Sequence, residues 1–126
     1  MREIKFRAWE KNHKEMLEVL GIFFDVQTIK HKNLKIRGNT NPFNDGYPNT
    51  NFCDIELMQF TGLLDKNGKE VYEGDIVTIL SNGYPKEVKW EPRYCGFNIR
   101  PNRRNAKGYE VIGNIYENPE LLGGKK

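Results

Sequence analysis

Apolar and polar residues alternate along much of the chain or gather in short apolar runs, and both patterns predict β-strands. Residues 3–9 alternate strictly, so Ile4, Phe6 and Ala8 share one face of a half-buried strand. Trp9 falls on the opposite, polar face, where it either closes the end of a barrel or lies exposed.

The central stretch, residues 57–77, opens with an apolar run and then contains two predicted turns. The turn at residues 65–69 includes Asn67-Gly68, residue types that tolerate the positive φ angles of a tight hairpin. The turn at residues 73–75 leads into the β-branched residues 76–80, which predict a central strand.

Residues 16–24 fit two patterns. Their apolar residues recur at helical spacing, yet Gly21 would weaken a helix by about 1 kcal/mol. We predict a strand here. A further hairpin is predicted around Lys32-Asn33, with apolar positions at Ile29, Leu34 and Ile36.

Residues 38–51 are predicted to form a long loop, because they are rich in asparagine and too polar to bury. Such a loop is either functional or merely mobile, and the sequence favours neither reading. Only Phe43 and Tyr47 in this segment offer aromatic rings that could anchor a partner.

The C-terminal half continues the pattern of short extended segments and turns. Strands are predicted at 87–90, 95–99 and 109–116, and a basic, asparagine-rich loop lies at 101–108. Beyond the last strand, Asn118 is a candidate cap and Pro119 suits the first position of a helical turn.

The predicted fold class is mainly β. We expect SH3-like barrel character in the C-terminal half, with an N-terminal β-hairpin subdomain packed against it; the likeness to SH3 barrels carries no functional information. The chain of 126 residues forms a single unit over 1–126, or two β subdomains of about 1–56 and 57–122. Residues 123–126 form a frayed tail.

Composition and charge narrow the class further. Hydrophobic residues make up 37% and charged residues 29%, no run is long enough to cross a membrane, and no signal peptide is visible, so we expect a cytoplasmic protein. Cys53 and Cys95 are then expected to be free thiols.

The formal net charge is +3, but residues 38–79 carry two basic and seven acidic groups, whereas residues 80–107 carry seven basic and two acidic groups. This alternation either compensates internally or steers an anionic partner.

Three blocks of the sequence carry a resemblance: MREIKFRAW, TGLLDKNGKEVYEGDIV and YEVIGNIYENPELL. They anchor the beginning, middle and end of the chain, and together they resemble the YopX family of phage and prophage proteins. The resemblance implies a small, β-rich protein of a bacterial host cell, with SH3-like barrel character and an uncharacterised biochemical function. It implies no catalytic or binding residues.

The usual catalytic constellations are not visible. The turn at 65–69 has its glycine at the wrong position for a calcium loop. A zinc site would need His13, His31, Cys53 and Cys95, which lack the short spacings of structural sites. Glu70, Glu73 and Asp75 are read as solvated turn residues. We therefore expect no enzyme, no metal and no cofactor.

The strongest functional signal is a basic segment interleaved with aromatic residues, a combination that single-strand binders use for phosphates and bases. Against this, Val88 and Trp90 would share one face of a strand, which predicts Trp90 in the core. The candidate nucleic-acid contacts are Lys86, Lys89, Arg93, Arg100, Arg103, Arg104 and Lys107.

Two function classes remain. The first is a non-catalytic accessory protein that binds another protein or itself, as a homo-oligomer, through its barrel surface and the 38–51 loop with Phe43 and Tyr47. The alternative is a nucleic-acid-binding protein that uses residues 86–107. No membrane partner is expected.

Overall fold

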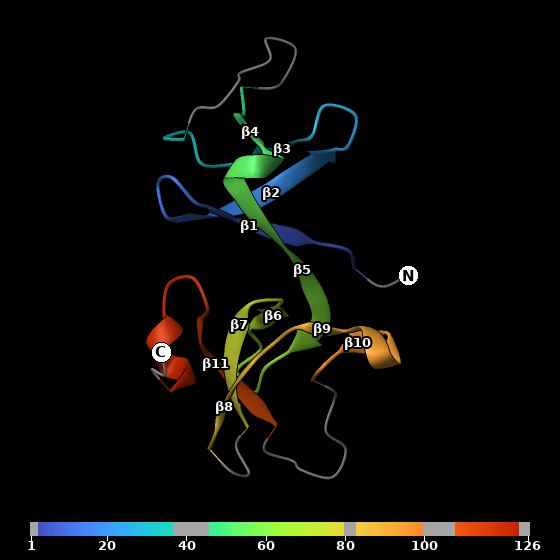
Figure 1. Cartoon of the computed structure of the whole chain (residues 1–126), viewed down its shortest axis with the longest axis vertical. Helices are drawn as coiled ribbons and strands as arrows, with labels where there is room; N and C mark the ends of the chain where they lie inside the picture. The colour runs from blue at the N-terminus through green and yellow to red at the C-terminus, as the bar shows by residue number, and fades with distance from the viewer. Residues whose placement is uncertain (1–2, 37–45, 80–82, 100–107, 124–126) are drawn as a thin grey trace. The chain divides into compact units, whose positions relative to one another are not determined.

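The computed structural model describes residues 3–36, 46–79, 83–99 and 108–123 (Figure 1). These residues form eleven strands and three 3₁₀ helices of three or four residues each. The fold is therefore mainly β, as predicted. The chain forms two compact units, one of residues Lys5–Met58 and one of Met1–Ile4 with Gln59–Lys126, here called the N-terminal and C-terminal units.

The N-terminal unit is built from a sheet in the order β4-β3-β2-β1-β5, larger than the β-hairpin that the sequence predicts. Its strands are antiparallel where their registers are recorded, with Ala8 opposite Leu17 and Ile29 opposite Thr50. The elements are β1 (Phe6–Glu10), β2 (Glu15–Phe23), β3 (Thr28–His31), β4 (Asn49–Asn51), the 3₁₀ helix η1 (Phe52–Asp54) and β5 (Ile55–Leu64).

The core of this unit is small and aliphatic. It forms because alternate residues of the strands point to one face, the pattern that the sequence shows for β1. Its fully or nearly fully buried members are Ala8, Leu17, Ile29, Ile36 and Ile55, with Val19, Ile22 and Phe52 packed around them.

Glu15–Phe23 form β2, which confirms the choice of strand over helix for the segment 16–24. The register of β2 with β3 shifts between Val19 and Gly21, so the glycine lies at an irregularity of the sheet. There the ring of Phe23 lies 3.2 Å from where a Cβ at position 21 would be. Gly21 thus allows a β-bulge and the close approach of the Phe23 side chain.

The hairpin predicted around Lys32-Asn33 is wrong. β3 pairs with β4 instead, and Asn33 folds the chain back locally, because its side-chain oxygen accepts the Lys35 N–H at 3.0 Å. Leu34 is 56% exposed as a result.

The loop prediction for residues 38–51 is wrong at its C-terminal end, where Asn49–Asn51 form β4. Pro48 and Thr50 are buried, and their polar groups are satisfied: the Pro48 carbonyl accepts the His31 N–H, and the Thr50 hydroxyl is hydrogen-bonded to His31 Nε2. Tyr47 is half-buried, and Phe43 lies outside the described residues.

The C-terminal unit contains a three-stranded sheet in the order β11-β7-β8, a two-stranded sheet β10-β9, and the end of β5 paired with β6. Its elements are β6 (Glu70–Tyr72), β7 (Asp75–Ile79), β8 (Pro85–Glu87), β9 (Trp90–Glu91), η2 (Pro92–Tyr94), β10 (Gly96–Phe97), β11 (Tyr109–Asn114) and η3 (Pro119–Leu122).

The sheets are open, and the SH3-like barrel character predicted for this half is not confirmed. Strands β8, β9 and β10 have only two or three residues each, too few to carry a hydrogen-bonded ladder around a closed barrel. The predicted central strand is correct, since β7 lies between β11 and β8. The core contains Val71, Val77, Val88, Ile99 and Tyr109, with Leu63, Phe97 and Val111 against it.

The two turns of the central stretch form where the sequence predicts them. In the first, Gly68 has φ +83° and Asp65 accepts the N–H groups of Asn67 and Lys69 on one carboxylate oxygen. In the second, Gly74 has φ +84° and the Asp75 carboxylate accepts the Tyr72 N–H. Glycine is required at both positions because other residues rarely adopt such angles.

Candidate functional site

The extended strand is interrupted for two residues between β8 and β9, and the tryptophan that follows is exposed. β8 ends at Glu87 and β9 begins at Trp90, so the intervening residues do not continue the strand. Val88 is fully buried, whereas Trp90 is 46% exposed. The prediction that these two residues share a buried face is therefore wrong, because the strand alternation on which it depends stops at Glu87.

Asn98 holds this interruption in place through both its side chain and its backbone. Its Oδ1 accepts the Lys89 N–H at 3.0 Å, and its Nδ2 donates to the Glu87 carbonyl at 2.8 Å. Its own N–H donates to the Lys89 carbonyl at 3.0 Å, and its carbonyl accepts from Lys86 Nζ at 2.8 Å. One residue thus fixes the backbone on both sides of Val88.

Trp90 is supported from one side by Phe97. The two residues face each other across the β9–β10 pair, and their rings meet edge to face with centroids 5.2 Å apart and planes at 85°. Such pairs stabilise by about 0.5–1.5 kcal/mol beyond their buried area. The indole is therefore held at a defined angle although nearly half of the residue faces solvent.

Between β9 and β10 the chain turns through η2, which presents a second aromatic residue and a cation. Tyr94 is 46% exposed. The Arg93 side chain is 86% exposed, with its Nε 3.6 Å from Glu91 Oε1. The turn closes at Cys95, which adopts the left-handed conformation at φ +51°. We call the set of exposed residues Lys89, Trp90, Arg93 and Tyr94 the aromatic–basic surface.

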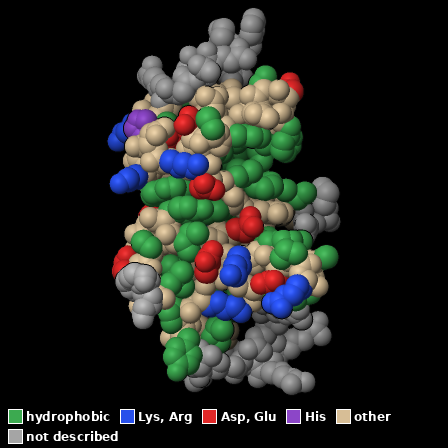
Figure 2. All heavy atoms as spheres, in the orientation of Figure 1, with side chains coloured by type: hydrophobic (Ala, Val, Ile, Leu, Met, Phe, Trp, Pro, Cys, Tyr) green, Lys and Arg blue, Asp and Glu red, His purple; other side chains and the backbone are tan. Residues whose placement is uncertain are grey.

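The structure brings only part of the predicted basic segment to this surface. Lys89 and Arg93 are exposed there, whereas Lys86 is half-buried and bound to the Asn98 carbonyl. Figure 2 shows carboxylates interspersed with the Lys and Arg side chains of this unit. Arg100, Arg103, Arg104 and Lys107 lie outside the described residues.

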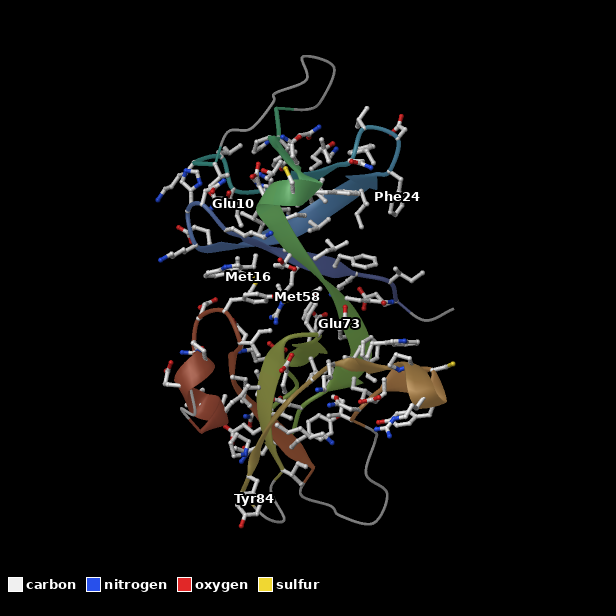
Figure 3. All side chains as sticks on the ribbon, viewed as in Figure 1. Glu10, Met16, Phe24, Met58, Glu73 and Tyr84 are labelled. Atoms are coloured by element: carbon white, nitrogen blue, oxygen red, sulfur yellow. The ribbon has the colours of Figure 1, made fainter. Side chains whose placement is uncertain are left out.

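A second exposed surface lies at the end of the β2–β3 hairpin in the N-terminal unit. Phe24, labelled in Figure 3, is 75% exposed, and Val26 is 63% exposed. Phe24 touches the rest of the unit through an edge-to-face contact with Phe52, at 6.2 Å between ring centroids. We call Leu20, Phe23, Phe24 and Val26 the hairpin-end patch.

Buried polar groups of the N-terminal unit form a third candidate. Glu10, 2% exposed, accepts the His13 N–H at 2.6 Å and lies 2.8 Å from His13 Nδ1. Burial alone would raise the pKa of Glu10, but the N–H groups of His13 and Asn12 and the imidazole of His13 outweigh it, and the pKa lies below its usual value.

His31 is fully buried nearby in the same unit. Its Nδ1 accepts the Asn33 N–H, which leaves Nε2 to donate to Thr50 Oγ1 at 2.9 Å. Burial lowers the pKa of His31, and the charge of Glu10 offsets part of that effect. With their hydrogen bonds directed at backbone and Thr50, these groups serve the fold.

Sequence reasoning missed Glu10, which lies one residue beyond the alternating segment 3–9. The signal was present, since the alternation of Ile4, Phe6 and Ala8 continues to position 10 on the same face. Phe6 and Ala8 become progressively buried along β1, and Glu10 completes that buried face.

The carboxylates of the central turns are structural rather than solvated, so that prediction is wrong for two of the three. Glu73 accepts the Gln59 N–H at 2.8 Å, and Asp75 is 2% exposed. Asp65, 7% exposed, also accepts the Val111 N–H at 3.0 Å. Burial would raise the pKa of Asp65, but three backbone N–H groups and Lys69 hold it below its usual value.

The residues considered for zinc do not assemble. Within residues 3–36, 46–79, 83–99 and 108–123, no three His, Cys, Asp or Glu side chains are placed to hold a metal ion. Cys53 and Cys95 are free and exposed, the first in η1 and the second after η2. The described chain also contains no helix that is long and apolar enough to cross a membrane.

Comparison with known proteins extends the three sequence blocks to nearly the whole chain. The model of the YopX protein family matches residues 5–123. No curated protein matches. Among solved structures, the crystal structure of protein EF1440 from Enterococcus faecalis is similar, with 30% sequence identity and a TM-score of 0.66 over 97% of this chain and 99% of that chain. The chain belongs to the YopX family.

Proposed function

We propose that the protein is a non-catalytic binding module of phage or prophage origin, which acts in the host cytoplasm and binds nucleic acid through the aromatic–basic surface. The observation that carries this proposal is the exposure of Trp90 beside Lys89 and close in sequence to Arg93 and Tyr94. Cations neutralise phosphates while aromatic rings stack on bases, and this division of labour needs no catalytic group.

The aromatic–basic surface has few cations available to bind phosphate, and their number sets the expected salt dependence of the affinity. Glu91 lies 3.6 Å from Arg93, and Lys86 is engaged by Asn98, so of these three cations Lys89 is the most available to a phosphate. Affinity should consequently depend on salt with a moderate slope. For a single strand each neutralised phosphate contributes about −0.7 to the slope of log affinity against log salt, so Lys89 and Arg93 together give about −1.4.

A salt titration tests the proposal. We expect a labelled oligonucleotide to bind at low salt in fluorescence anisotropy, with affinity falling linearly in log–log form as salt rises. The variant Lys89→Gln/Arg93→Gln should bind more weakly for every base sequence and lose up to about 1.4 units of slope, because two cations are gone.

The matched control removes the same charge from the N-terminal unit. Lys14→Gln/Lys35→Gln replaces two exposed lysines of that unit and should leave affinity and slope unchanged. Absence of binding to any oligonucleotide at low salt rejects the proposed function, and an equal loss in both double variants rejects the assignment to this surface.

A second candidate function is protein interaction or self-assembly, favoured by the hairpin-end patch. Large apolar side chains as exposed as Phe24 and Val26, gathered at one hairpin end, mark interaction sites more often than isolated exposed residues do. The half-buried Tyr47 contributes less free ring surface to such a contact than the sequence suggests.

A further inference from the structure

We infer that the ligand of the aromatic–basic surface is single-stranded nucleic acid, one base of which stacks on Trp90, and that Asn98 is the positioning residue that keeps this ring exposed. The inference rests on the proposed function and specifies its ligand class. It depends on the geometry of residues 86–98.

The indole of Trp90 is held in an exposed position and is not simply a loose surface side chain. Val88, two residues earlier, is fully buried, whereas the indole of Trp90 points outward. Phe97 packs against one side of the indole at 85°, which limits its movement. A preoriented ring loses less conformational entropy when a ligand stacks on it than a freely rotating side chain does.

Asn98 keeps the indole of Trp90 in this exposed position. The side-chain amide accepts the Lys89 N–H at 3.0 Å and donates to the Glu87 carbonyl at 2.8 Å, so it bridges the backbone on either side of Val88. Those bonds make the two-residue interruption stable, and the interruption reverses the face on which Trp90 would lie in a continuous strand. Asn98 touches no ligand in this scheme and acts through Trp90.

The aromatic–basic surface suits a single strand better than a duplex. Bases within a duplex are already stacked on each other, so an aromatic platform gains nothing from them unless they are extruded. The described residues contain no helix longer than four residues that could enter a major groove. The carboxylate of Glu91 beside Arg93 also weakens the continuous positive strip that a duplex backbone requires.

The test compares affinities of the full chain for a single-stranded oligothymidylate and for a duplex of equal length at one salt concentration. We expect the single strand to bind more tightly. Trp90→Ala should weaken its binding roughly 5- to 140-fold, the range of one lost stacking contact, whereas Trp90→Phe should retain most of the affinity. Oligothymidylate and oligoadenylate should suffer similarly, because stacking tolerates any base.

Tyr84→Ala provides the matched control. Tyr84, labelled in Figure 3, is 71% exposed and lies in the β7–β8 turn of the same unit. Removing it deletes a ring more exposed than Trp90 and should leave the affinity unchanged. If loss of either aromatic side chain weakens binding equally, the specific stacking site is wrong.

Asn98 is tested by a readout that requires no ligand. In a ¹⁵N spectrum the indole N–H signal of Trp90 is the one that disappears in Trp90→Phe. We expect Asn98→Ala to move this signal and to weaken single-strand binding to a similar extent as Trp90→Ala, with the Trp9 signal unchanged. Asn98→Asp, which retains the acceptor for Lys89, should restore part of the signal position.

The outcomes separate the inference from the proposed function. No binding to either nucleic acid overturns the proposed function and this inference with it. Equal or tighter binding of duplex, or full affinity in Trp90→Ala, overturns the inference and leaves the proposed function standing. An unmoved Trp90 signal in a folded Asn98→Ala variant overturns the positioning role alone.

Discussion

His31 shows how a single buried residue makes the stability of this protein depend on pH. The imidazole is fully buried and neutral, with Nδ1 accepting from Asn33 and Nε2 donating to Thr50. Protonation would place a second N–H opposite the Asn33 N–H and would charge a group without water. Burial accordingly lowers the pKa of His31, although the carboxylate of Glu10 offsets part of the effect.

The folded chain therefore binds fewer protons than the unfolded chain just below the ordinary histidine pKa of about 6.5. Stability should fall as the pH decreases through this range, by at most about 1.4 kcal/mol per pH unit for one proton. Urea unfolding between pH 8 and 5 measures this slope. His31→Gln should be less stable at pH 8 but should have a flatter profile above pH 5.

A second decline should begin below about pH 4.5 and should occur in both proteins, because the lowered pKa values of Glu10 and Asp65 stabilise the fold only while these groups are ionised. Parallel profiles of the two proteins between pH 8 and 5 would show that His31 is not the source of the first decline.

For single residues, the sequence predicts burial better than it predicts hydrogen-bond partners. Alternation places Ala8 in the core and, followed one step further, Glu10 beside it. It could not identify His31 as a structural residue, because its partner Thr50 is 19 residues away in a segment that reads as a polar loop. Trp90 was misplaced for the same reason, since its exposure depends on the remote side chain of Asn98.

Gly113 lies where β11 packs closely against the start of η3. A Cβ at Gly113 would lie 2.5 Å from Asn118 Oδ1 and 2.9 Å from Leu121 Cδ1. Asn114 holds the turn between the two elements, because its side-chain oxygen accepts the N–H groups of Tyr116 and Glu117. Asn118 occupies the N-cap position of η3 as predicted, but its side-chain oxygen accepts the Asn114 N–H and not an N–H of η3.

We expect Gly113→Ala to destabilise the protein by about 1–3 kcal/mol in urea unfolding, because the added methyl group must displace η3 from β11. Gly96→Ala is the matched control. Its Cβ would meet nothing closer than 3.7 Å, so its effect should stay within about 0.5 kcal/mol. A tolerated alanine at position 113 would mean that η3 shifts without cost.

The elements that the sequence predicted correctly are those with enough residues to show a period. β1, β2, β7 and β11 have five to nine residues each and alternate or form clear apolar runs. β4, β8, β9 and β10 have two or three, and their existence depends on partners that are remote in sequence. Short strands of this kind have no period of their own, so the pattern could place neither their ends nor their exposed faces.

At the scale of the whole molecule, the family match over residues 5–123 confirms the resemblance carried by three short blocks. The structure explains two of these blocks as turn and packing requirements. The central block contains Asp65, Gly68, Gly74 and Asp75, which build two turns, and the C-terminal block contains the Gly113–Asn118 contact. These positions preserve the fold, so the blocks identified the family without locating a binding surface.

The exposed hairpin-end patch predicts that whole molecules associate with one another. We expect the purified protein to sediment as a concentration-dependent oligomer, with apolar side chains of two copies covering each other. Phe24→Ser/Val26→Ser should shift it to monomer, whereas Leu34→Ser, at a comparably exposed apolar position, should not. A wild-type monomer at high concentration contradicts a homo-oligomeric role.

Asp65 ties the 65–69 turn to the last strand, because one of its carboxylate oxygens accepts an N–H from Val111, 46 residues later in the chain. A ribosome that adds about 5–20 residues per second needs roughly 2–9 s to synthesise that interval. In the later part of that interval, after β8 has been made, β7 has β8 on one side but lacks β11 on the other, and a nascent chain with such an open edge is prone to pair with another. Production of this protein should therefore be most vulnerable to aggregation late in translation, just before its final strand emerges.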